Sequence, residues 1–169
     1  MDITRLIADD HAEQRRLFAI IDELRPTDGA ALKAVWSRLR ALLDTHAEAE
    51  ERFFYPELLK IGRGADSESP VEETRDAIKD HNEIRDTAAK VDTLGVGSAE
   101  WFEAVAAANK ANGDHMAEEE RQGLSDFRRH AGIELRHVLA VEFARFSAEN
   151  LTGVKPVDKD VDAYVMQNS

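Results

Sequence analysis

Four of the six histidines in the chain recur at nearly constant spacing, and histidine is the side chain that most often binds metal ions in proteins. Successive members lie 35, 35 and 34 residues apart: His11, His46, His81 and His115. Two of them are followed four residues later by a glutamate, Glu50 and Glu119. Residues four apart share one face of an α-helix, so each glutamate is expected beside its histidine.

The sequence around these histidines also repeats. The pattern D-H-x-E-x-R occurs at residues 10–15 and 80–85, and the pattern H-x-x-x-E-E-R occurs at 46–52 and 115–121. We therefore interpret the chain as two similar helical hairpins, related by a pseudo-twofold axis.

Apolar residues recur at three- and four-residue steps, which predicts helices to carry these motifs. Long helices are expected at about 3–24, from 32 to the region of Pro56, at 70–94 after the N-cap Ser69, and from Ala99 to Gln122 or beyond after the N-cap Ser98. Short connections between them predict an all-α, antiparallel up-down-up-down four-helix bundle over about 3–129. An additional C-terminal helix at 133–150 completes the domain of residues 1–150, and 151–169 are expected to form a loosely held tail.

The four histidines should meet in one layer of this bundle and point inward. Each lies at a similar distance from its hairpin turn, and each continues the apolar stripe of its helix. An unpaired buried carboxylate costs several kcal/mol, so two in an apolar layer need a compensating charge. A metal ion supplies that charge, whereas the alternative is a set of ordinary core histidines bonded to their neighbours. Six nitrogen and oxygen ligands are more than one tetrahedral zinc ion binds. They suit two bridged metal ions, such as iron or manganese.

The composition narrows the classes of function. The chain has 169 residues, a net charge of −12 and no cysteine. One domain is expected, without disulfides, thiolate nucleophiles or iron–sulfur clusters. The acidic balance argues against nucleic-acid binding. We find no signal peptide and no stretch of membrane-span length, so the expected location is the cytoplasm and no membrane partner is predicted.

The histidine and glutamate motifs resemble the hemerythrin-like, or HHE cation-binding, domain, and the stretch EERFFYPEL at 50–58 adds to the match. The resemblance covers about residues 3–129 and implies a non-haem di-iron centre with oxo and carboxylate bridges. It implies that Glu50 and Glu119 bridge the two iron ions and that four histidines are terminal ligands: His11, His46, His81 and His115. Iron is favoured over manganese or zinc.

One position departs from the oxygen-carrying members of that family, which have a fifth histidine where this chain has Arg85. The four-His, two-Glu set is similar to the bacterial type tied to repair of iron centres under nitrosative stress, although the N-terminal cysteine-bearing segment usual there is missing. Other bacterial relatives of this size are linked to peroxide decomposition or oxygen sensing.

The predicted function is therefore binding or processing of a small oxidant: dioxygen, hydrogen peroxide or nitric oxide. The alternative is a carrier or sensor module that binds oxygen or iron reversibly without turnover, so whether the protein is an enzyme stays open. A metal-free structural bundle is disfavoured by the buried charges. A protein partner or a second copy of the chain would have the tail at 151–169 as its candidate surface.

Four further residues are candidates for contacts with the ligands. Tyr55 would face the metals only if Pro56 bends the helix, because nine residues separate it from His46. Arg15 and Arg85 would pair with Glu50, Glu119 or a bound anion, or with outer carboxylates, and Asn112 is a candidate hydrogen-bond donor near His115. Two other groups are expected at the surface: His130 and His137, and a solvated acidic face of Glu48, Glu51, Glu118 and Glu120.

Overall fold

The computed structural model describes residues 1–66 and 68–169, and this part of the chain contains helices and no strand. The all-α prediction is confirmed. None of the described helices has the length and hydropathy of a membrane span. The helices, in chain order, are α1 (Ile3–Glu23), α2 (Gly29–Phe53), α3 (Tyr55–Ile61), α4 (Pro70–Asp92), α5 (Ala99–Arg121), α6 (Gly123–His130), α7 (Ile133–Glu149) and α8 (Val161–Asn168).

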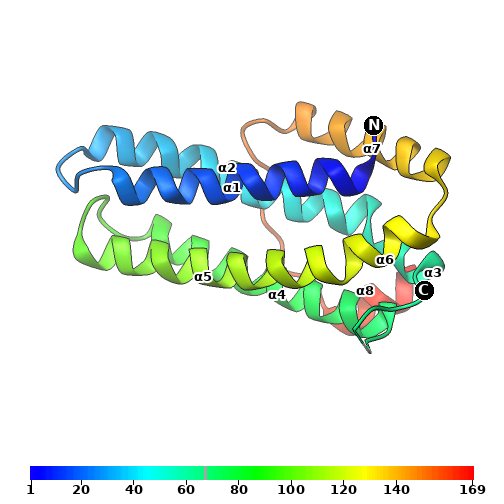
Figure 1. The fold of residues 1–169 in the computed structure, drawn as a ribbon. Helices are drawn as coiled ribbons and strands as arrows, with labels where there is room; N and C mark the ends of the chain where they lie inside the picture. The colour runs from blue at the N-terminus through cyan, green and yellow to red at the C-terminus, as the bar shows by residue number, and fades with distance from the viewer. Residues whose placement is uncertain (67) are drawn as a thin grey trace.

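Two antiparallel hairpins form the bundle. Helix α1 packs on α2 and α4 on α5, and the hairpins meet through α1 with α5 and α2 with α4. Figure 1 shows both hairpin turns at one end of the molecule and both chain termini near the other. The turns abut closely: Gly97 has a φ of 84°, and a Cβ there would lie 2.4 Å from the carbonyl oxygen of Pro26. A side chain at residue 97 would therefore separate the turns.

The helix boundaries follow the expected local signals. Ser69 and Glu72 form a capping box at the start of α4, and Ser98 accepts a hydrogen bond from the main-chain N–H of Trp101 at the start of α5. Pro56 lies in the first turn of α3, so the helix breaks at Phe54 as predicted. A second break, at Gln122, separates α5 from α6. The sequence placed the end of this helix at Gln122 or beyond, but it did not predict the separate helix α6.

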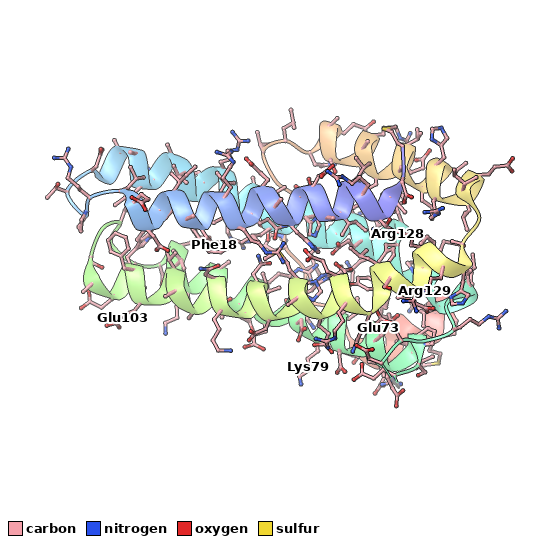
Figure 2. The ribbon with its side chains drawn as sticks, viewed as in Figure 1. Phe18, Glu73, Lys79, Glu103, Arg128 and Arg129 are labelled. Atoms are coloured by element: carbon pink, nitrogen blue, oxygen red, sulfur yellow. The ribbon has the colours of Figure 1, made fainter. Side chains whose placement is uncertain are left out.

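The core consists of two apolar clusters separated along the bundle. One lies near the hairpin turns and includes Leu17, Phe18, Trp36 and Trp101, and the other includes Ile7, Phe54, Ile78, Phe127 and Phe143. Figure 2 labels Phe18 between the hairpins and Lys79 and Glu103 on the outer sides of α4 and α5. The predicted histidines lie in sequence, on each helix, between the residues of the two clusters.

The C-terminal region differs from the loosely held tail that we expected. Helix α7 packs on α1 and α2, and α8 packs on α3 and α4. Tyr164 and Val165 of α8 are buried, and the Tyr164 hydroxyl donates a hydrogen bond of 2.6 Å to the main-chain oxygen of Glu51. Pro156 and the charged residues precede the helix rather than prevent it, and the buried Tyr164 and Val165 fix it to the bundle.

Candidate metal centre

The six predicted ligands meet in one buried layer, and none of them is more than 4% exposed. Glu50 lies at the middle of this layer: its Oε1 is 2.9 Å from His46 Nε2 and its Oε2 is 3.3 Å from His81 Nε2. Glu119 Oε2 is 3.3 Å from His11 Nε2. The Nε2 atoms of His81 and His115 are 3.1 Å apart. All four imidazoles therefore present the same ring nitrogen to one small region.

Glu50 belongs to two groups of side chains that are each suited to hold a metal ion. His11, His46 and Glu50 bring ligand atoms within 4.8 Å of one another, and Glu50, His81 and His115 do the same. A carboxylate shared by two histidine pairs matches a pair of bridged metals better than a single ion. Glu119 lies in the same layer but is in neither three-residue group.

Several atoms of the layer are buried with no hydrogen-bond partner among the described residues. They are the Nε2 atoms of His11 and His46, Oε2 of Glu119 and both carboxylate oxygens of Glu50. Such polar atoms normally find partners, because leaving them unpaired inside a protein costs about 1–3 kcal/mol each. Their convergence is explained by a cation, and mixed imidazole and carboxylate donors fit iron. The residues present therefore fit a two-iron centre.

The outer nitrogen of every histidine faces a carboxylate. The four pairs, with their Nδ1–oxygen distances, are His11 with Glu120 at 2.9 Å, His46 with Asp10 at 3.1 Å, His81 with Glu51 at 2.8 Å and His115 with Asp80 at 3.5 Å. A carboxylate that accepts the Nδ1 proton directs the lone pair of Nε2 toward the centre and fixes the plane of the ring. All four rings are thus oriented for binding at Nε2.

One of these outer carboxylates, Glu51, was assigned wrongly to a solvated face, because it is only 3% exposed. Glu120 is exposed, as predicted, but it also bonds to His11. The repeats contained the signal that was missed: each of the four carboxylates is the immediate neighbour in sequence of a predicted ligand, as Asp10 is of His11. His130 and His137 are exposed, as predicted.

The buried glutamates of the layer are held in their charged form by the groups around them. Burial alone would raise the pKa of Glu50, but without a metal its pKa is well below the ordinary value because protonated His46 and His81 stabilise the anion. Burial opposes ionisation of Glu51 as well, yet its bonds to His81 and its neighbours Arg85 and Lys159 lower its pKa to about 2. Both carboxylates are therefore anionic at neutral pH.

Tyr55 reaches the centre because of the helix break before it. Its side chain is fully buried, and its hydroxyl donates a hydrogen bond of 2.6 Å to Glu119 Oε1. The helix breaks at Phe54 and the ring turns inward, which is the bend that we expected Tyr55 to need in order to face the metals. Asn112 forms no hydrogen bond with a predicted ligand in the described part of the chain. Its amide donates to Gln14 Oε1 at 2.9 Å, so it links α5 to α1 instead.

Both arginine candidates pair with the outer carboxylates. Arg15 bonds to Glu120 at 2.7 Å and Arg85 to Glu51 at 2.8 Å, which decides between the alternatives left open by the sequence. Lys159, in the segment before α8, also bonds to Glu51 and reaches Glu48 at 2.6 Å. The C-terminal segment thus contacts the residue that supports His81.

A family model described as hemerythrin HHE cation binding domain matches residues 2–124, which is most of the chain. The chain belongs to this family. The match contains all six residues of the buried layer and ends before α7 and α8. Membership in the HHE family and the two histidine–glutamate groups indicate a metal-binding module. Searches of curated proteins and of solved structures gave no match.

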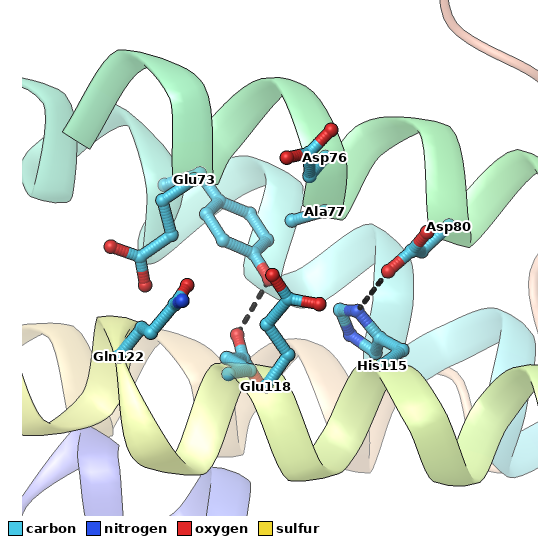
Figure 3. A pocket seen from close by; sticks show the side chains of 9 residues that line it. Glu73, Asp76, Ala77, Asp80, His115, Glu118 and Gln122 are labelled. Atoms are coloured by element: carbon cyan, nitrogen blue, oxygen red, sulfur yellow. Dashed lines mark hydrogen bonds and ion pairs between the residues drawn. The ribbon is translucent and has the colours of Figure 1, made fainter. Parts of the chain in front are cut away.

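A small cavity borders the centre between α4 and α5. It has a volume of about 10 Å³, and His115, Glu119 and Tyr55 form its inner wall. Figure 3 shows Glu73 from α4 and Gln122 from the end of α5 extending into the same space, with Glu118 closer to the viewer. Burial, together with the nearby carboxylates Glu119 and Asp126, raises the pKa of Glu73 to about 8.

The raised pKa of Glu73 predicts a pH-dependent stability. An unfolded glutamate titrates near 4.5, so the favourable contribution of protonated Glu73 is complete below that pH and is lost as the pH rises through about 8. In metal-free protein, we expect Glu73→Gln to gain stability relative to the parent chain between pH 5 and pH 8, by a few kcal/mol. Urea unfolding across this pH range measures the difference.

Glu83→Gln, an exposed position on the same helix, is the control and should change little with pH. A stability difference between Glu73→Gln and the parent chain that is the same at pH 5 and pH 8 would contradict the assignment.

Proposed function

We propose that the two hairpins hold a pair of iron ions between them. His11 and His46 would bind one ion and His81 and His115 the other, with Glu50 and Glu119 shared. The observation that carries this proposal is the convergence of buried, unpartnered nitrogen and oxygen atoms while every outer Nδ1 faces a carboxylate. Each histidine is already oriented for a cation that its surroundings require.

The chain supplies orientation and a dry environment. The apolar clusters on either side exclude bulk water from the layer, and the outer carboxylates hold the imidazole planes. The Tyr55 hydroxyl holds one oxygen of Glu119 by its hydrogen bond, which leaves Oε2 directed at His11. When bound, iron would supply the redox chemistry and the open positions for a small ligand.

We infer from this arrangement that the protein binds or processes a small oxidant, with dioxygen, hydrogen peroxide and nitric oxide as candidates. The position of the fifth histidine is held by Arg85, whose guanidinium bonds to Glu51. This supports the four-histidine, two-glutamate type. That type favours a role in oxidative or nitrosative stress or in repair of iron centres. A reversible carrier or sensor is the second candidate, because Lys159 and Tyr164 connect the C-terminal segment to Glu51.

Metal content tests the centre directly. We expect about two iron ions per chain in aerobically purified protein, with a near-ultraviolet charge-transfer band. His46→Ala and His115→Ala should each remove the band and most of the iron, because each variant loses one of the two histidines proposed to bind one of the ions. His137→Ala, an exposed histidine, is the control and should keep both ions. One zinc ion or no metal in the parent chain would refute the proposal.

Peroxide consumption separates an enzyme from a carrier. An enzyme should consume hydrogen peroxide catalytically in the parent chain and lose this turnover in His46→Ala and His115→Ala. Repeated spectral change on addition of an oxidant, without turnover, would instead identify a carrier or sensor.

The outer carboxylates should set the affinity for metal. Asp10→Asn weakens the acceptor for the Nδ1 proton of His46, so we expect about 10–100-fold weaker iron binding by competition with a chelator. Asp9→Asn is the matched control, because Asp9 is the adjacent residue but pairs with Arg5 at the surface. Equal affinity of the two variants would show that Asp10 has no part in holding the metal.

A further inference from the structure

The cavity beside the centre lies next to a group of surface carboxylates. Glu68, Asp76 and Glu118 bring carboxylate oxygens within 4.8 Å of one another, and Asp76 and Glu118 also line the cavity. Arg121, the nearby cation, is bonded to Asp66 at 2.9 Å. Like charges held this close repel one another, so the group gains energy from a bound cation.

Two buried side chains extend this acidic group inward. Glu73 is 5% exposed and Gln122 is 2% exposed. Both carboxylate oxygens of Glu73 and Oε1 of Gln122 are buried without a hydrogen-bond partner in the described part of the chain. Buried oxygen atoms without donors are ligands suited to a hard divalent cation. The cavity that they line ends at Glu119 and His115, which belong to the proposed centre.

The internal repeat shows that this polar lining is special to one face. The repeat aligns α1 with α4 in the way that it aligns His11 with His81. It aligns α2 with α5 in the way that it aligns His46 with His115. The counterparts of Glu73, Asp76, Glu118 and Gln122 are, in that order, Ile3, Leu6, Ala49 and Phe53. All four counterparts belong to or pack against the apolar core. The two faces have the same backbone plan, but one is apolar and the other carries unpartnered oxygens.

Gly123 provides the room for Glu73. A Cβ at this position would lie 2.3 Å from Glu73 Oε1, so any side chain there would displace the carboxylate. Its counterpart in the first hairpin is Phe54, whose ring is fully buried in the core. The second hairpin therefore has a carboxylate and a small cavity where the first has a packed aromatic ring.

We propose that Glu68, Asp76 and Glu118 form an entry site for divalent cations, and that the cavity lined by Glu73 and Gln122 passes the cation to Glu119 and His115. This inference rests on the proposed metal centre. The carboxylates raise the local concentration of cations at the surface, and the buried oxygens replace water ligands along the way. A cavity of about 10 Å³ admits roughly one water-sized particle, so the passage favours small ions that shed their water.

The rate of iron uptake tests this passage. Metal-free protein is mixed anaerobically with Fe²⁺ at physiological ionic strength. The reaction is quenched after set times with a chromogenic Fe²⁺ chelator, and the iron that remains bound to the protein is measured. We expect the double variant Asp76→Asn, Glu118→Gln to load at least about tenfold more slowly while it reaches the same final iron content. Glu73→Gln keeps the side-chain shape but lacks the carboxyl group, which ionises when it binds a cation, and it should also slow loading.

The control is the double variant Asp86→Asn, Glu103→Gln, which removes the same two charges from exposed positions on the same two helices. At about 1.5 Å per residue, these positions lie roughly 15 and 22 Å along their helices from Asp76 and Glu118, beyond the Debye length of about 8 Å. The control should therefore load within about twofold of the parent chain.

Each other outcome has a defined meaning. Equal slowing of the Asp76/Glu118 and Asp86/Glu103 variants would show general attraction by the acidic surface and overturn the entry site. Unchanged loading of both the Asp76/Glu118 and the Glu73 variants would overturn it too. A lower final iron content would show that these residues act on the centre itself, which also contradicts the passage. Failure of the parent chain to take up iron would refute the proposed centre instead.

Discussion

The cost of burying two carboxylates and four imidazoles between apolar clusters is the constraint on which the structure depends. Glu50 is fully buried, and neither of its oxygens has a hydrogen-bond partner among the described residues. Removing such a group from water costs several kcal/mol unless opposite charge surrounds it. The proposed metal ions would supply this charge, and the chain arranges the groups around them in layers. The imidazoles face Glu50, and an outer carboxylate faces each imidazole. Arginines at the edge, such as Arg85, bind some of these outer carboxylates.

The bundle architecture makes these layers compatible. Four long helices carry one histidine each at a common height, and the break at Phe54 turns Tyr55 inward below that height. The same register places the neighbours of the ligands in sequence, such as Asp10 and Glu51, opposite the histidines of other helices. A single repeated motif therefore positions both the inner and the outer groups.

Much of this arrangement followed from the sequence, because periodicity and caps are local signals. The four long helices, the Ser69 capping box and the convergence of His11 with its counterparts needed only spacing. The partners of Glu51 could not be predicted from spacing, because the direction of its side chain depends on how the hairpins pack. In the sequence, Glu51 was one more charge in an acidic run. The docking of α8 was missed for a similar reason, since its contacts involve Tyr164 and the main chain of a distant helix.

The segment that carries Lys159 makes the two hairpins differ, although their sequences repeat. Glu120 pairs with His11 and has one arginine, Arg15, beside it. Glu51 pairs with His81 and has both Arg85 and Lys159 beside it. Additional positive charge draws electron density from Glu51, so His81 receives less of it through their hydrogen bond. The two halves of the histidine layer are thereby electronically distinct, so the two metal positions proposed above would be unequal.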